Sequence, residues 1–391
     1  MVLNRKGKTK WQCNMYWENY FIKAGDEFSP FWKSYLTEDK RDVLFIMGIG
    51  FDPRTNVGIK AIYSNKSEGL KDTIALRYYK QVEDIGTANH SLVQKHINEL
   101  TAFLSENSLT PCVEKNIIQR SEDDKSIASI NATQSFNAED LRNYNEIILD
   151  ISAMPRGIFL PLLNKLMTII KNGNKEGDAK DKKNLHVIVT ENATLDSKIH
   201  DNGEAEEGIF IHGLGINDTA KTKQHKEVWL ALLGEGQTKQ YDTIRKEIDA
   251  AEICPVLPFP SKDLKRSDKL IIEYQDLLFN DSSFDPKNII YAHEKNPFQV
   301  YRLLKKAIRR YDKSLSILSG CKIIVSAFAS KLLTVGAFLA VFESREEGKN
   351  AGIKHVESLG HDLVLGEEKS LEEILNENNL VELWLAGNPY E

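Results

Sequence analysis

Short apolar runs alternate along this chain with longer segments in which apolar residues recur at every third or fourth position. The runs predict buried strands, and the longer periodicity predicts amphipathic helices such as 89–106 and 298–313. The expected strands lie near 43–47, 73–79, 115–119, 147–151, 185–189, 208–213, 228–233, 253–257, 288–292, 323–325, 353–359 and 380–386. Strands that alternate with helices at this spacing require right-handed crossovers and form a parallel sheet.

The pattern occurs twice along the chain. Residues 42–54, DVLFIMGIGFDPR, form an apolar run that ends in a G-x-G turn, and residues 227–239, EVWLALLGEGQTK, repeat that order. NEIILDISAMPR at 145–156 similarly matches GCKIIVSAFASK at 320–331. We therefore expect an internal duplication and an α/β fold of two tandem Rossmann-like three-layer units with mostly parallel sheets.

The length of 391 residues and the hydrophobic fraction of 41% suit two domains with separate cores. We expect an aromatic-rich helical cap at 1–41, a first Rossmann-like domain at 42–200, a connection at 201–226 and a second Rossmann-like domain at 227–391. The aromatic residues of the cap, such as Trp17, Phe21, Phe31 and Trp32, pack against the first domain or form a face for a partner chain.

Charge and composition exclude several classes of protein. The net charge of −6 argues against a nucleic-acid partner, and the sequence holds no apolar stretch long enough to cross a membrane. The basic N-terminus lacks the apolar core of a secretory signal. The four cysteines are far apart, which indicates neither a disulfide framework nor a metal site. We expect a cytoplasmic protein without a metal or a cofactor.

In parallel α/β sheets, ligands bind beyond the carboxyl ends of the strands. The expected ligand-binding residues are small, hydroxylated or charged residues that follow a predicted strand. They are Gly48, Gly50, Asp52, Arg54, Ser152, Arg156, Gly234, Gly236, Lys239, Lys262, Lys295, Ser326, Ser330 and Lys331. Cations, hydroxyl groups and helix N-termini all favour phosphate, so a cleft between the halves is expected to bind a nucleotide-like or phosphorylated small molecule.

Structural alternatives exist for the same residues. The glycines can serve only to make tight turns, and Ser152 and Ser326 can cap the following helices. Arg54 and Arg156 can form internal salt bridges with Asp52 and Asp150.

Signatures of catalysis are scarce. The sequence contains no Walker A motif, no G-x-G-x-x-G fingerprint, no H-E-x-x-H and no G-x-S-x-G elbow. The candidate acid–base residues are His293 and Glu294, with Glu235 from a neighbouring strand end. They leave open an enzyme that acts on a nucleotide or a sugar phosphate.

The loops that follow the first and fourth strands of each half resemble those of the CARF sensor modules and of the fused pair called SAVED. The segments that carry this resemblance are GIGFDPR with GEGQTK, and DISAMPR with VSAFASK. Those families belong to prokaryotic antiviral systems and bind cyclic oligonucleotide messengers between two Rossmann-like halves. The resemblance implies a signalling sensor or regulatory subunit with a separate effector, acting through a protein partner or a homo-oligomer. A third possibility is an interaction subunit of a larger assembly that binds no ligand.

Overall fold

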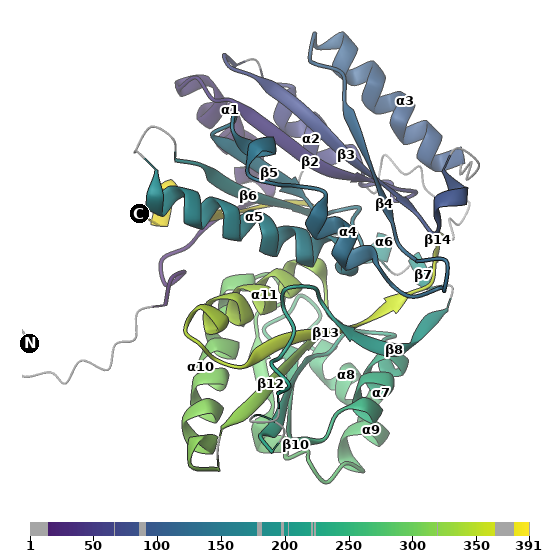
Figure 1. The fold of residues 1–391 in the computed structure, drawn as a ribbon, viewed down its shortest axis with the longest axis vertical. Helices are drawn as coiled ribbons and strands as arrows, with labels where there is room; N and C mark the ends of the chain where they lie inside the picture. The colour runs from purple at the N-terminus through teal and green to yellow at the C-terminus, as the bar shows by residue number, and fades with distance from the viewer. Residues whose placement is uncertain are drawn as a thin grey trace, which may run out of the picture.

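The computed structural model describes residues 15–65, 67–85, 91–177, 182–196, 199–201, 203–219, 222, 224–318, 320–363 and 379–390. It contains a seven-stranded and a six-stranded sheet, each covered by helices on both faces (Figure 1). The predicted fold class is confirmed: the chain consists of two mostly parallel, Rossmann-like three-layer units.

Five parallel strands form the centre of the first sheet, in the order β6-β5-β2-β3-β4. They are β2 (Val43–Ile49), β3 (Lys71–Tyr79), β4 (Val113–Ile118), β5 (Glu146–Asp150) and β6 (Asn184–Thr190). The residues of β2, β5 and β6 are buried throughout, because helices cover both faces of the sheet.

The second sheet repeats this order as β13-β12-β9-β10-β11. Its parallel strands are β9 (Lys226–Leu232), β10 (Ala250–Pro258), β11 (Ile290–Ala292), β12 (Cys321–Ala327) and β13 (Ala351–Ser358). The two halves also share one antiparallel strand at the same place: β15 (Leu380–Ala386) lies beside β6, and β8 (Glu204–Phe210) lies beside β13. The predicted duplication is therefore visible in the order of six strands of each sheet, and β1 of the first sheet has no counterpart.

The helices form three layers around the two sheets. They are α1 (Phe28–Glu38), α2 (Val57–Tyr63), α3 (Ser91–Glu106), α4 (Ala128–Gln134), α5 (Arg156–Glu176), α6 (Ala193–Asp196), α7 (Thr238–Glu247), α8 (Arg266–Glu273), α9 (Gln275–Phe279), α10 (Pro297–Leu315) and α11 (Lys331–Glu346). Helices α1 to α3 cover the outer face of the first sheet, and α7 to α9 cover that of the second. Between the sheets, α4, α5, α10 and α11 form one continuous apolar core (Figure 1).

The boundaries of the sheets differ in two places from the expected domain ranges. β15 falls within 227–391 but pairs with β6 of the first sheet, because its fully buried residues fill the position between β6 and β1 (Phe21–Ala24). β8 falls within the expected connection 201–226 and joins the second sheet. A small additional sheet pairs β7 (Ile199–Asp201) with β14 (His361–Leu363).

The described part of the expected cap joins both halves. It is only partly helical: β1 is the edge strand of the first sheet, and α1 packs on a face of that sheet. Trp32 is fully buried there, and Phe21 and Phe31 are partly buried. Trp17 is also fully buried: its Nε1 donates to the Leu385 carbonyl at 2.9 Å, and its ring meets that of Tyr301 of α10 at 5.3 Å. Residues 1–14 lie outside the described residues.

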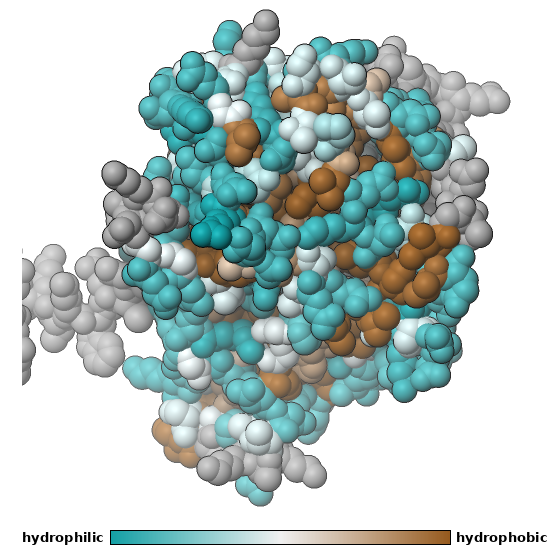
Figure 2. Space-filling view, turned by 45° about the horizontal axis from the view of Figure 1, so that its top comes forward, coloured by the Kyte–Doolittle hydropathy of each residue, from teal (hydrophilic) through white to brown (hydrophobic). Residues whose placement is uncertain are grey.

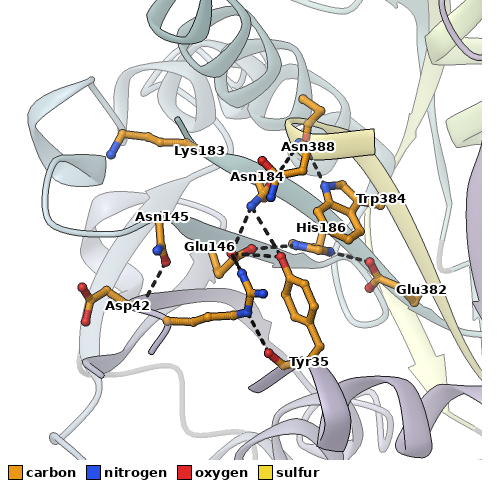
Figure 3. A network of polar contacts seen from close by, with 12 residues as sticks. Tyr35, Asp42, Asn145, Glu146, Lys183, Asn184, His186, Glu382, Trp384 and Asn388 are labelled. Atoms are coloured by element: carbon orange, nitrogen blue, oxygen red, sulfur yellow. Dashed lines mark hydrogen bonds and ion pairs between the residues drawn. The ribbon is translucent and has the colours of Figure 1, made fainter. Parts of the chain in front are cut away.

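A buried polar network attaches β15 to the sheet (Figure 3). His186 of β6 lies between two carboxylates, with Nε2 at 2.9 Å from Glu146 of β5 and Nδ1 at 2.6 Å from Glu382 of β15. Glu146 also accepts from the Tyr35 hydroxyl and from Arg41, each at 3.0 Å. The network thus ties α1, β5, β6 and β15 together with charged hydrogen bonds.

Within the described residues, no helix combines the length and the hydrophobicity needed to cross a membrane. The face shown in Figure 2 is mostly hydrophilic, with small apolar patches between the polar residues. Among the cysteines that the structure describes, Cys112, Cys254 and Cys321 are free thiols, and Cys13 lies outside the described residues.

Candidate functional site

The first turns of α5 and α11 meet at the boundary between the two halves. Arg156, the first residue of α5, donates to the carbonyl of Ala329, and Lys331, the first residue of α11, donates to the carbonyl of Ser152. At the other end of these helices, Lys171 Nζ lies 2.7 Å from Glu346 Oε2. The two helices therefore run side by side in the same direction.

This arrangement places the carboxyl ends of the two sheets next to each other. Each helix returns along the strand that precedes it, so β5 and β12 both end near Arg156 and Lys331. We call this region the joint edge: the carboxyl ends of the two sheets around the first turns of α5 and α11. The predicted edges lie side by side and do not face each other across the molecule.

Serine and proline residues set the shape of the two loops. Ser152 Oγ accepts from the Thr190 amide at 2.9 Å, and Ser326 Oγ accepts from Trp229 Nε1 at 3.0 Å. The Ser152 hydroxyl thus holds the loop after β5 against β6, and the Ser326 hydroxyl joins β12 to β9. The cap of α11 is Ser330, whose side chain accepts from an amide of the first turn, whereas Pro155 precedes α5 without a side-chain cap.

Arg54 forms a buried ion pair, as the structural alternative for this residue expects. Its Nη2 lies 2.7 Å from Asp52 Oδ2, and its Nη1 lies 2.7 Å from Asp196 Oδ1. Burial opposes both charges, but the paired charges prevail: the pKa of Asp52 is lowered by the Arg54 guanidinium, and the pKa of Arg54 is raised by Asp52. Arg54 thus brings positive charge to the joint edge together with two neutralising carboxylates.

Lys331 is a cation of the joint edge whose charged form is disfavoured by its surroundings. Burial and the nearby Arg54 guanidinium lower its pKa to about 8, against the opposing effect of Asp52. An anion placed beside Lys331 would restore a more ordinary pKa, and this linkage favours anion binding. Asp150 is also perturbed: burial raises its pKa to about 6, although the Ser152 amide donates to it at 2.9 Å.

Two glutamates of the joint edge escaped the sequence analysis. Glu191, directly after β6, accepts at Oε1 from the Leu332 amide in the first turn of α11, at 3.2 Å. Glu357, near the end of β13, accepts from Ser126 Oγ at 2.7 Å and lies beside Gly157, where an added Cβ would be 3.1 Å from Oε1. Burial raises the pKa of each glutamate.

At two of the predicted glycine positions, the surrounding atoms leave no room for a side chain. A Cβ at Gly48 would lie 1.9 Å from the Tyr78 hydroxyl, and one at Gly234 would lie 2.1 Å from the Phe328 carbonyl oxygen. Gly236 adopts a φ of +73° that favours glycine, and its amide donates to Glu273 at 2.7 Å. The Gly50 carbonyl lies 2.8 Å from His96 Nδ1.

The candidate acid–base residues form an ion-paired group in the second half. Arg266, which the sequence analysis missed, binds Glu235 through Nε at 2.6 Å and Glu294 through Nη1 at 2.9 Å. His293 Nδ1 accepts from the Lys295 amide at 3.0 Å, so that nitrogen already has a partner. These contacts give the carboxylates a structural role.

The remaining predicted lysines lie on the same half. The Lys262 amide donates to Glu294 at 2.7 Å, and the exposed Lys239 has its Nζ 3.8 Å from Glu204. Of the predicted residues, the structure therefore gathers Asp52, Arg54, Ser152, Arg156, Ser330 and Lys331 at the joint edge. Among the described residues, no group of histidine, cysteine and acidic side chains is arranged to hold a metal ion.

No protein-family model and no curated protein matches the chain. Solved structures with a related arrangement include a proposed universal stress protein from Pseudomonas aeruginosa, with 10% identity and a TM-score of 0.23 over 81% of this chain and 93% of that chain. A universal stress protein from Archaeoglobus fulgidus has 8% identity and a TM-score of 0.23 over 79% and 95% of the two chains. A proposed tRNA (m1A22) methyltransferase from Streptococcus pneumoniae, in complex with S-adenosyl-L-methionine, has 10% identity and a TM-score of 0.21 over 64% and 90%. Similarities at this level carry no functional argument, which has to come from the site itself.

Proposed function

We propose that the chain is a sensor or regulatory subunit that binds an anionic, nucleotide-like ligand at the joint edge. The observation that carries the proposal is the reciprocal contact between the halves, in which Arg156 reaches Ala329 and Lys331 reaches Ser152. Through it, two equivalent strand–loop–helix units present their helix N-termini and their cations side by side.

Phosphate suits this arrangement for two physical reasons. The partial positive charges at the N-termini of α5 and α11, helices of 21 and 16 residues, favour an anion at the joint edge. The guanidinium of Arg156 and the ammonium of Lys331 add charge-assisted donors. A ligand that spans both helices would contact both halves, and its binding would thereby be felt across the whole chain.

A sensing role is favoured over turnover by the state of the candidate acid–base groups. Glu235 and Glu294 share Arg266. The resemblance of the strand-end loops to CARF and SAVED modules supports the finer proposal that the ligand is a nucleotide messenger of an antiviral signalling system. In that role the chain acts through a separate effector or through a second copy of itself.

The proposal is tested by thermal-shift screening of the full chain against mononucleotides, linear dinucleotides and cyclic oligonucleotides, followed by calorimetric titration of the compounds that stabilise it. Arg156→Ala should weaken binding by roughly 1.5–3 kcal/mol, the value of a charge-assisted hydrogen bond. The matched control is Lys33→Ala on the exposed face of α1, which should bind like the wild type. A folded Arg156→Ala variant with unchanged affinity would remove the joint edge as the binding site.

A further inference from the structure

The two glutamates of the joint edge occupy equivalent places in the duplicated fold. Glu191 follows β6 and Glu357 lies near the end of β13, and these are the corresponding strands of the two sheets. Each glutamate reaches the first turn of the helix in the opposite half: Glu191 accepts from Leu332 of α11, and Glu357 lies beside Gly157 of α5.

Glu191 stands where an incoming anion would be stabilised, because it accepts from an amide of the first turn of α11, and Glu357 lies beside the first turn of α5. A helix N-terminus attracts a carboxylate for the same reason that it attracts phosphate, because its unpaired amides and its dipole favour negative charge. Both glutamates are partly exposed to solvent. A carboxylate and a phosphate cannot share one position without strong repulsion.

We propose that Glu191 and Glu357 are autoinhibitory: they hold the anion positions of the joint edge in the ligand-free state and must leave when the anionic ligand binds. This inference rests on the proposed function. Together with the contacts of Arg156 and Lys331, the hydrogen bonds from Leu332 to Glu191 and from Ser126 to Glu357 form a latch of four contacts between the halves. A ligand that displaces the carboxylates opens this latch and changes how the halves contact each other.

The surroundings of the two glutamates support their displacement. Glu191 faces the carboxylate of Asp196 as well as the cations Arg54 and Lys331, and Glu357 faces Ser126 and Arg120. Burial raises the pKa of both, so keeping each carboxylate ionised at the joint edge already costs free energy. When Glu191 leaves, its charge no longer opposes a phosphate near Lys331 and Arg54.

The test is calorimetric titration of the full chain with inorganic pyrophosphate, using wild type, Glu191→Gln, Glu357→Gln and the double variant. Glutamine keeps the size of the side chain and an oxygen that accepts from Leu332 or Ser126, so each variant should melt near the wild-type temperature. Removing one negative charge next to a bound anion should tighten pyrophosphate binding at least about fivefold for each single variant. The control Glu206→Gln changes an exposed carboxylate of β8 and should leave the affinity unchanged.

The outcomes separate this inference from the proposed function. Unchanged or weaker pyrophosphate binding by both single variants, or no binding by the double variant, overturns the autoinhibitory role. If nucleotide binding is still lost in Arg156→Ala, the proposed function survives that result. If neither wild type nor the double variant binds pyrophosphate or any nucleotide, both proposals fail. Tighter binding in both single variants but not in Glu206→Gln supports the latch.

Discussion

Replacing His186 by leucine should destabilise the first half by about 3–5 kcal/mol, the cost of removing one partner from a buried charged pair. His186, Glu146 and Glu382 are all fully buried, and the imidazole bridges the two carboxylates at 2.9 and 2.6 Å. The leucine variant leaves Glu382 with an uncompensated buried charge. Glu146 is less affected, because Arg41 still lies 3.0 Å away.

The same network predicts the pH dependence of stability. Burial alone would lower the pKa of His186, but Glu382 and Glu146 raise it from 6.5 to about 9. A group with a raised folded-state pKa contributes fully below its unfolded pKa and loses its contribution as the pH rises through the folded pKa. The wild type should therefore lose up to about 3 kcal/mol between pH 6.5 and 9, at 1.36 kcal/mol per pKa unit.

The assay is urea unfolding followed by tryptophan fluorescence, because the rings of Trp384 and Trp32 lie tilted beside that of His186, with centroids 4.6 and 5.0 Å from it. His186→Leu should unfold at lower urea and should lack the loss of stability between pH 6.5 and 9. The control His186→Leu/Glu382→Leu also removes the stranded carboxylate and should be more stable than the single variant. A single variant as stable as wild type, or a double variant less stable than the single one, would refute this reasoning.

Two further predictions concern packing, and thermal unfolding measures both. Gly234→Ala should destabilise the second half by about 1–3 kcal/mol because its Cβ would collide with the Phe328 carbonyl. Gly173→Ala in α5 should stabilise the protein by roughly 0.5–1 kcal/mol, because an added Cβ there has no neighbour within 4 Å. Equal effects of the two substitutions would contradict the steric argument. Trp17→Ala should lower the free energy of unfolding by about 3–5 kcal/mol, because Trp17 is fully buried between the halves. Lys33→Ala should leave it almost unchanged, because Lys33 is exposed. If Trp17→Ala is as stable as the wild type, the N-terminal segment does not join the two halves.

The parallel core of each half could be predicted from the sequence because its strands are buried on both faces. Runs such as Val43–Ile49 and Cys321–Ala327 are fully buried strands, and the periodicity of α3 and α10 reports their one-sided packing. The correspondence of the loops that precede Arg156 and Lys331 was also visible in the sequence, since strand, Ser-Ala and cation follow each other in both copies, whereas their reciprocal contacts were not.

The expected strand at 380–386 is confirmed as β15, but the pairing of the antiparallel strands and the position of the glutamates could not be predicted in the same way. β15 is an apolar run whose pattern fits either sheet, and only packing decides that it pairs with β6. Glu191 and Glu357 look like ordinary surface acids in the sequence. Their position near the ends of corresponding strands could have marked them as candidate site residues. Their contacts with the opposite half, however, depend on how the two halves pack together. Arg266 likewise gains its role from Glu235 and Glu294, which are distant in the sequence.

The insertion of β15 between β1 and β6 has a consequence for biosynthesis. The strands of the second sheet lie between residues 204 and 358, so the ribosome delivers all of them before Leu380–Ala386 emerges. Until then, β6 exposes an unpaired edge, and such an edge invites pairing with other chains. During this interval His186 also lacks its hydrogen-bond partner Glu382. The half that is synthesised first must therefore finish folding last, and chaperones that shield nascent chains have their clearest target at the edge of β6.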